Sequence, residues 1–188
     1  MSLVIRAGLF LLLMSMPFTQ AWADKYQDAI KVFKEAGRSS TFFGNSYGYT
    51  IFPTIGKGGI VVGAAHGKGR VYAAGKHVGD ASMAQLTLGF QLGGQAYSQI
   101  IFFQDKRAFD EFTRGNFEFG VQAEAVAITA GASAGASTTG NSATASGGMN
   151  NAITRGGYYR GLAVFTVAKG GLMYEASVGG QKFKYTAK

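Results

Sequence analysis

The sequence predicts an α+β protein: a single domain in which a strongly bent antiparallel sheet, partly barrel-like, carries an N-terminal helix and a short helix near residues 105–114. Two segments place apolar residues at helical spacing, whereas most of the remaining chain reads as short apolar or alternating stretches. Glycine supplies 29 of the 188 residues. In strands, glycine marks bulges, sharp bends and close backbone approach, so this abundance indicates a sheet that bends strongly.

The chain begins with a predicted signal peptide, residues 1–23. One positive side chain, Arg6, precedes an apolar run at 7–13, and Ala21 and Ala23 satisfy the small-residue rule for cleavage. The apolar run is well short of the roughly 20 residues that span a bilayer, which favours removal over a retained anchor. Removing 23 of the 188 residues leaves 165 as one domain, 24–188. We therefore expect an exported protein of the bacterial periplasm or the periphery of the outer membrane.

Charge and composition narrow the class of partner. The sequence contains no cysteine, which excludes a disulfide framework and thiol chemistry. Its net charge is +8, or +7 once the leader with its single arginine is removed. A protein with this positive charge attracts anionic partners, for example a lipid headgroup, a glycan or a nucleic acid. Net charge alone also fits a generally basic surface with no specific ligand.

The first predicted helix covers residues 24–36, with Gly37 as its C-cap. Its apolar stripe is formed by Tyr26, Ala29, Ile30 and Phe33. Lys31, Lys34 and Arg38 follow at i, i+3 and i+7 and so predict a basic second face. This pattern suits either ordinary core packing with a solvated face or an amphipathic helix at a membrane surface.

After a Gly/Ser/Asn-rich connector, the pattern changes to strands. Pro53 is expected to stop the first strand, "HGKG" at 66–69 reads as a turn, and Leu86, Leu88 and Phe90 are expected on one apolar face. A helix over 105–114 starts at Asp105, and the terminal "KFKY" extends the sheet. The predicted strands are 47–55, 59–65, 70–74, 83–92, 97–103, 117–125, 162–168 and 172–179. The weakly apolar segment 131–150 is expected to be a loop or a weak rim that contributes little to the core.

No motif of a nucleotide or catalytic site is complete. Lys57 and Lys68 follow glycines, but a phosphate-binding loop needs a glycine six residues earlier, where Ile51 and Val62 stand, and Ser or Thr afterwards. The two histidines have no ligand partner at metal-binding spacing. The paired acids Asp110 and Glu111 are expected on the solvated face of their helix. We therefore expect neither an enzyme nor a cofactor.

Three ordered blocks of the chain carry a family resemblance. The first is "YGYTIFPTIGKGGIVVGAAHGKGRVY" at 47–72, the second "LTLGFQLGGQAYSQIIFFQDKRAFDEFTRGNFEFG" at 86–120, and the third "GLAVFTVAKGGLMYEASVGGQKF" at 161–183. Together they resemble the SYLF lipid-binding domain family, and the resemblance covers about residues 24–183, nearly the whole expected domain.

The resemblance implies a protein that binds acidic lipids. Eukaryotic members bind phosphoinositides, partly through a basic N-terminal amphipathic segment, and some bind actin. A signal peptide makes phosphoinositides and actin poor candidates here, so we expect an anionic lipid or membrane surface as partner and no nucleic acid. The resemblance implies binding through the basic amphipathic N-terminal segment, where Lys25, Lys31, Lys34 and Arg38 occupy the corresponding region. The candidate lipid-binding residues are Lys25, Lys31, Lys34, Arg38, Lys57, Lys68 and Arg70.

One alternative remains open from the sequence alone. A signal peptide, many glycines and aromatic-rich alternating strands also suit an integral outer-membrane barrel of eight strands. The helix expected at 105–114 and continuous apolar runs such as "IIFF" count against it.

Overall fold

The computed structural model describes residues 20–59, 62–88, 95–120, 126–128, 157–169 and 180–188, without the side chains of 20–24, 87–88 and 126–128. The predicted signal peptide lies mostly outside the described residues. The predicted loop at 131–150 and the predicted strand at 172–179 lie entirely outside them.

The fold is α+β, as the sequence predicts. The helices are α2 (Gln20–Glu35), α3 (Gly37–Ser40), α4 (Phe42–Asn45) and α5 (Lys106–Thr113). The strands are β1 (Gly48–Gly59), β2 (Val62–Ala73), β3 (Lys76–Leu88), β4 (Gln95–Phe103), β5 (Phe117–Glu118), β6 (Val126–Ile128), β7 (Leu162–Lys169) and β8 (Lys182–Ala187). They form one sheet in the order β5-β8-β3-β2-β1-β4-β7-β6, in which β6 pairs with β7 in parallel and the other described pairs are antiparallel.

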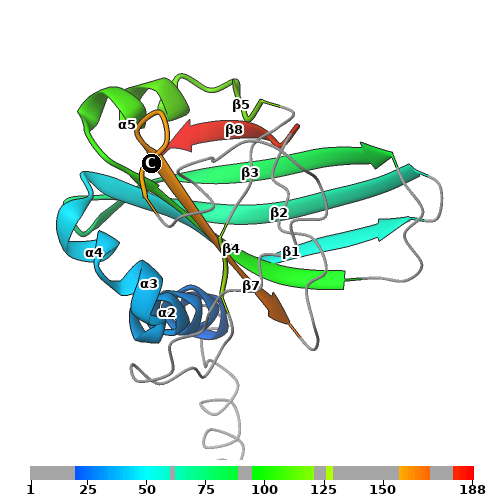
Figure 1. Ribbon diagram of the computed structural model, residues 1–188, viewed down its shortest axis with the longest axis horizontal. Coiled ribbons are helices and arrows are strands. Elements are labelled where there is room, and N and C mark those ends of the chain that lie inside the picture. The colour runs from blue at the N-terminus through cyan, green and yellow to red at the C-terminus, as the bar shows by residue number, and fades with distance from the viewer. Residues whose placement is uncertain (1–19, 60–61, 89–94, 121–125, 129–156, 170–179) are drawn as a thin grey trace, which may run out of the picture.

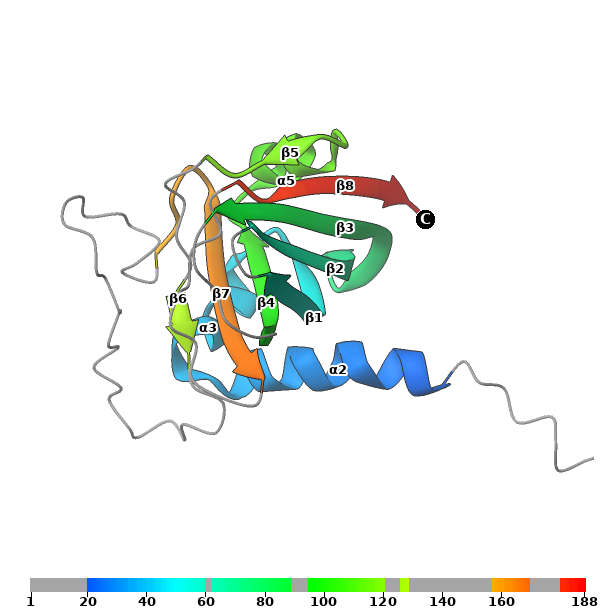
Figure 2. The ribbon, with the colours of Figure 1, turned by 90° about the vertical axis from the view of Figure 1, so that its right-hand side faces the viewer.

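The two faces of the curled sheet carry separate apolar cores. Helices α2, α3 and α4 lie on the outward face over β1, β4 and β7 (Figures 1 and 2), where Phe33, Ile51 and Phe165 are fully buried. Helix α5 packs on the inward face beside β8, where Phe52, Met83 and Phe112 belong to the other core. Burying one element on each face is the usual way in which a sheet hides both apolar surfaces.

Strand β4 explains the continuous apolar run "IIFF". Ile100 and Phe102 belong to the outward core, whereas Ile101 and Phe103 belong to the inward core, and all four are fully buried. A strand with both faces covered does not need polar alternation.

The predicted turn at 66–69 is wrong, because "HGKG" lies within strand β2. His66 and Lys68 point to solvent, whereas Gly67 and Gly69 point inward. A Cβ atom at Gly69 would stand 2.7 Å from the ring of Phe52, and one at Gly67 would stand 2.6 Å from Ile55 Cγ1. These glycines therefore serve close packing of neighbouring strands rather than a turn.

The first strands also end at other residues than the sequence predicts. Pro53 does not stop β1: the pairing register shifts between Ile51 and Ile55, and the proline lies in this irregularity. Proline has no N–H to donate, so a bulge accommodates it inside a strand. The turn between β2 and β3 is Ala74-Gly75, with φ of 47° and 74°, the backbone typical of a tight two-residue hairpin.

The leucine face predicted for residues 83–92 was expected to be apolar and buried. In the described part of this stretch, the opposite face is the buried one. Leu86 is 78% exposed, whereas Gln85 is 3% exposed. The inward space at this end of the sheet is polar: Gln99 and Gln181 exchange two amide hydrogen bonds of 2.9 and 3.1 Å, and Gln181 also donates to Tyr97 and Gln85. Paired amides satisfy each other, so glutamine can occupy an inward position that leucine was expected to fill.

Two further stretches depart from expectation. The predicted connector after Gly37 forms α3 and α4, and the predicted long strand at 117–125 is β5 only as far as Glu118, with 121–125 outside the described residues. Phe42 explains the helical connector, because its ring lies 5.4 Å from that of Phe102 and 5.1 Å from that of Phe165. Tertiary contacts of this kind override a weak local preference.

Candidate functional site

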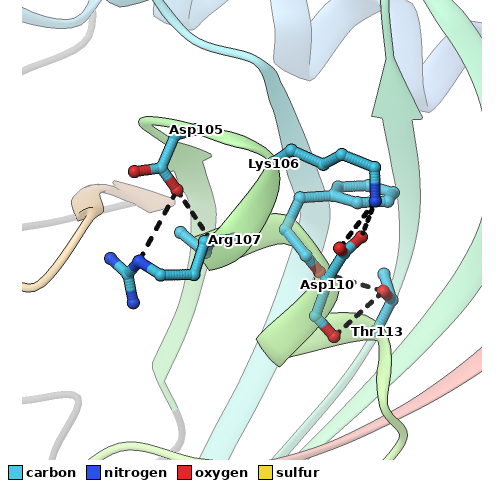
Figure 3. Close-up of polar contacts among 7 residues, drawn as sticks. Asp105, Lys106, Arg107, Asp110 and Thr113 are labelled. Carbon is cyan, nitrogen blue, oxygen red and sulfur yellow. Dashed lines mark hydrogen bonds and ion pairs between the residues drawn. The ribbon is translucent and has the colours of Figure 1, made fainter.

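The acidic pair on α5 is accounted for by helix structure. Asp105 caps the helix by accepting a 2.8 Å bond from the N–H of Ala108, and Asp110 accepts from Lys106 Nζ at 2.6 Å (Figure 3). Glu111 pairs in the same i,i+4 manner with Arg107 at 3.3 Å. Surface pairs at this spacing support a helix. Asp110 and Glu111 thus lie on the solvated face, as expected.

The histidines have no metal-binding neighbourhood in the part of the chain that the structure describes, where no three His, Cys, Asp or Glu side chains gather. His66 is exposed on β2. His77 Nε2 lies 3.0 Å from the carbonyl oxygen of Gly79 and 3.1 Å from Asp80 Oδ1.

A basic hollow of about 360 Å³ lies on the outward face of β2, β3 and β8, beside α2. We use the term basic hollow for this depression. Its polar lining consists of Tyr26, Lys68, Arg70, Asp80, Ser82, Lys184 and Thr186.

The strand register creates the basic hollow. Outward-pointing residues of the three strands, namely 68 and 70 of β2, 80 and 82 of β3, and 184 and 186 of β8, are aligned by the pairing in cross-strand rows. One row is Lys68, Ser82 and Lys184, and the next is Arg70, Asp80 and Thr186. Neighbouring strands lie about 4.8 Å apart, so the backbones of Lys68 and Lys184 are about 10 Å apart. Two long ammonium side chains at that separation can reach one anionic group placed over Ser82.

The electrostatics of the basic hollow favour an anion. Lys68, Arg70 and Lys184 contribute three positive charges against the single carboxylate of Asp80, which His77 contacts. Neither Lys68 nor Lys184 forms an ion pair within the described ranges. Serine and threonine hydroxyls add neutral donors of the kind that bind phosphate oxygens.

Tyr26 joins α2 to this surface. Arg70 lies over its ring, with the guanidinium carbon 4.2 Å from the ring centroid, and Lys25 Nζ lies 5.4 Å from the same centroid. Burial raises the pKa of Tyr26, although the positive charge of Arg70 opposes that shift. The phenol therefore stays neutral at physiological pH and does not compete with an anion through its own charge.

The structure separates the seven predicted lipid-binding residues into groups. Lys68 and Arg70 line the basic hollow, Lys25 lies beside it, and Lys57 lies near the end of β1. The other three lie elsewhere. Lys31 is 3.9 Å from Glu35, Lys34 lies over the ring of Phe43, and Arg38 belongs to α3.

The predicted basic face of Lys31, Lys34 and Arg38 is interrupted, because α2 ends at Glu35 and Ala36 takes an extended backbone conformation before α3 begins. The apolar stripe of α2 is core: Tyr26, Ala29, Ile30 and Phe33 are 0–6% exposed. Of the two interpretations of this helix, the described conformation therefore shows core packing with a solvated face.

Sequence reasoning missed Asp80, Ser82, Lys184 and Thr186. The signal for Lys184 was present in "KFKY", since lysines two residues apart in a strand share a face, and Lys182 and Lys184 are both exposed. Their approach to Lys68 could not be read from the sequence, because it depends on β8 pairing with β3 rather than with a neighbour in the chain.

Residues 84–186 match the family described as "Las17-binding protein actin regulator" (Ysc84), the SYLF family. The chain belongs to this family. The SYLF match begins within β3, so the chain's α2, β1 and β2 precede it, whereas Lys184 falls inside it.

A curated SYLF relative is "Beta cell expansion factor A" of Aeromonas veronii, which is 26% identical over 156 residues. The aligned region covers 82% of this chain and 51% of the relative, so the chain spans about half the relative's length. Among the described helices, none is both long and apolar enough to cross a bilayer.

Proposed function

We propose that this protein is a non-enzymatic, exported envelope protein that binds acidic lipid at a membrane surface. The observation that carries the proposal is the basic hollow, in which Lys68, Arg70 and Lys184 converge on one face of the sheet. Membership of the SYLF family supports a lipid-binding role, and the signal-peptide pattern of residues 1–23 supports export.

The strand cations are better placed for this role than the helix cations. An amphipathic helix binds a bilayer by burying its apolar face in the interface. In α2, that face already packs against Ile51, Phe165 and neighbouring residues of the sheet. Insertion of α2 would therefore first have to break the outward core, whereas Lys68 and Lys184 can meet headgroups without any rearrangement.

Co-sedimentation with vesicles tests the proposal. The exported protein should bind vesicles of mixed neutral and anionic lipid, should ignore purely neutral vesicles, and should release as salt concentration rises. Each cation near an anionic surface contributes about 1 kcal/mol, so the double change Lys68→Glu and Lys184→Glu should weaken partitioning at least about thirtyfold.

Matched variants separate the basic hollow from charge in general. Lys76→Glu with Arg114→Glu makes the same change in net charge at exposed residues outside the basic hollow and should have a smaller effect. The triple change Lys31→Glu, Lys34→Glu and Arg38→Glu tests the helix surface predicted from the sequence. If only this triple variant loses binding, the lipid contact lies on the helices and not in the basic hollow.

Two outcomes would overturn the lipid proposal itself. One is equal binding to neutral and anionic vesicles. The other is co-sedimentation with actin filaments but not with anionic vesicles, the result suggested by the wording of the family description. An integral protein would instead stay with the membrane fraction after alkaline extraction, whereas we expect release.

A further inference from the structure

One end of the sheet exposes large apolar side chains. The end of β1, the start of β2 and the end of β3 lie side by side there, since Gly58 pairs with Ala64 and Ala64 pairs with Leu86. We call this region, residues 57–59, 62–64 and 86–88, the sheet tip. Leu86 is 78% exposed and Val62 is 57% exposed.

The apolar residues of the sheet tip continue the face that carries the basic hollow. The outward-pointing residues along this part of β2 are, in order, Val62, Ala64, His66, Lys68 and Arg70. Behind the row of Ala64 and Leu86 comes a row formed by His66, Ala84 and Lys182. The next row is formed by Lys68, Ser82 and Lys184.

The spacing of these rows matches a membrane interface. A strand rises about 3.3 Å per residue, so the two rows lie about 7 and 13 Å behind the row of Leu86. Apolar groups of peripheral proteins enter about 5–10 Å into the boundary between headgroups and acyl chains. With Leu86 at that boundary, Lys182, Lys68 and Lys184 would lie at the depth of the headgroups.

We infer that the protein docks on anionic bilayers with the sheet tip first, so that Val62 and Leu86 enter the interface while the basic hollow holds a headgroup. The inference rests on the proposed lipid binding and adds an orientation and an apolar anchor to it. Charge complementarity selects the occupant, because cations directly behind an exposed apolar end suit an anionic bilayer. A second copy of this chain would bring a like-charged face to the same place.

A polar substitution at the sheet tip tests the anchor. The change Val62→Gln with Leu86→Gln should lower partitioning onto anionic vesicles at least about tenfold while the salt dependence remains. Both side chains point to solvent, so the melting temperature should not fall. The matched control is Tyr159→Gln, which makes the same apolar-to-glutamine change at an exposed residue outside the sheet tip and should leave binding nearly unchanged.

A depth measurement tests the orientation. The sequence has one tryptophan, Trp22, which lies in the predicted leader, so the exported protein starting at Asp24 has none. In that protein, Leu86→Trp places a fluorophore at the sheet tip and Thr186→Trp places one at the far side of the basic hollow. Brominated acyl chains in anionic vesicles should quench tryptophan at position 86 and leave tryptophan at position 186 largely unquenched.

The outcomes separate the two proposals. If the parent protein does not bind anionic vesicles, the proposed function fails and the inference fails with it. If the parent binds but the double glutamine variant binds equally well, or position 86 is no more quenched than position 186, only the inference is overturned. If the parent protein forms dimers and the double glutamine variant does not, while both bind vesicles equally, the sheet tip serves self-association instead.

Discussion

At the residue scale, the inward side of β2 has no room for side chains at positions 67 and 69. A Cβ atom at Gly69 would meet the Phe52 ring at 2.7 Å and the Ile51 carbonyl oxygen at 2.8 Å. Gly69→Ala should therefore destabilise the fold by about 1–3 kcal/mol, since added atoms in a packed core force neighbours to shift. For a domain of this size, the melting temperature should fall by about 3–10 °C.

Gly56→Ala is the matched control for that change. Gly56 lies on an exposed part of β1, and no atom stands within 4 Å of the place its Cβ would take. Alanine there should leave the melting temperature unchanged or slightly higher, because it reduces the freedom of the unfolded chain. Equal stability of the parent and the Gly69→Ala variant would show that the inward packing of β2 is looser than described.

At the element scale, α2 crosses the predicted cleavage site between Ala23 and Asp24. Cleavage would leave Asp24 at the start of the helix, where a carboxylate interacts favourably with the positive end of the helix dipole. The described buried residues of α2 begin at Tyr26 and continue to Phe33, and all of them remain in a chain that starts at Asp24.

We therefore predict that the exported protein starts at Asp24 and that a chain starting at Asp24 melts within about 2 °C of one starting at Gln20. N-terminal sequencing of the protein from the periplasmic fraction checks the first statement, and a thermal scan of the two chains checks the second. Recovery of the exported protein with Met1 retained would contradict the predicted processing.

Elements were predictable where local pattern and tertiary role agree. The helical stripe of α2 and the cap of α5 by Asp105 both follow from spacing and residue type. "HGKG" was misread because glycine also has a packing use that only the neighbouring Ile55 and Phe52 reveal. Gln85 was misplaced because its inward position depends on Gln181, which lies 96 residues later in the chain.

The candidate site was predictable only in part for the same reason. Lys68 and Arg70 stand out in the sequence as cations within a glycine-rich block. Their association with Lys184 requires the sheet order, in which β3 stands between β2 and β8. A surface assembled from distant strands leaves no spacing that a single sequence can display.

At the scale of the whole molecule, the layer between the helices and the outward face of the sheet contains several tyrosines. Burial raises the pKa of Tyr49 to about 12 and that of Tyr158 to about 12, and it also raises the pKa of Tyr26. The ring of Tyr49 stacks on Tyr72, with ring centroids 5.0 Å apart, and the ring of Tyr158 packs edge-on to Phe42 at 5.1 Å. The layer is therefore built to hold neutral phenols.

This layer should make the fold sensitive to alkali. A tyrosine whose pKa is higher in the folded than in the unfolded chain gives its full stabilisation below pH 10 and loses it as the pH rises from 10 to 12. At pH 11, Tyr49 and Tyr158 should each cost on the order of 1 kcal/mol, allowing for the water that reaches both rings. Melting temperatures measured from pH 8 to pH 11.5 should fall steeply above pH 10.

The double change Tyr49→Phe and Tyr158→Phe isolates this effect, because phenylalanine keeps the ring contacts and cannot ionise. The variant should melt like the parent at pH 8 and about 4–8 °C above it at pH 11. Lysine deprotonation affects both proteins equally, so the difference between them reports the two phenols. A parent and variant that lose stability in parallel above pH 10 would show that alkaline unfolding starts elsewhere than in the layer that joins the helices to the sheet.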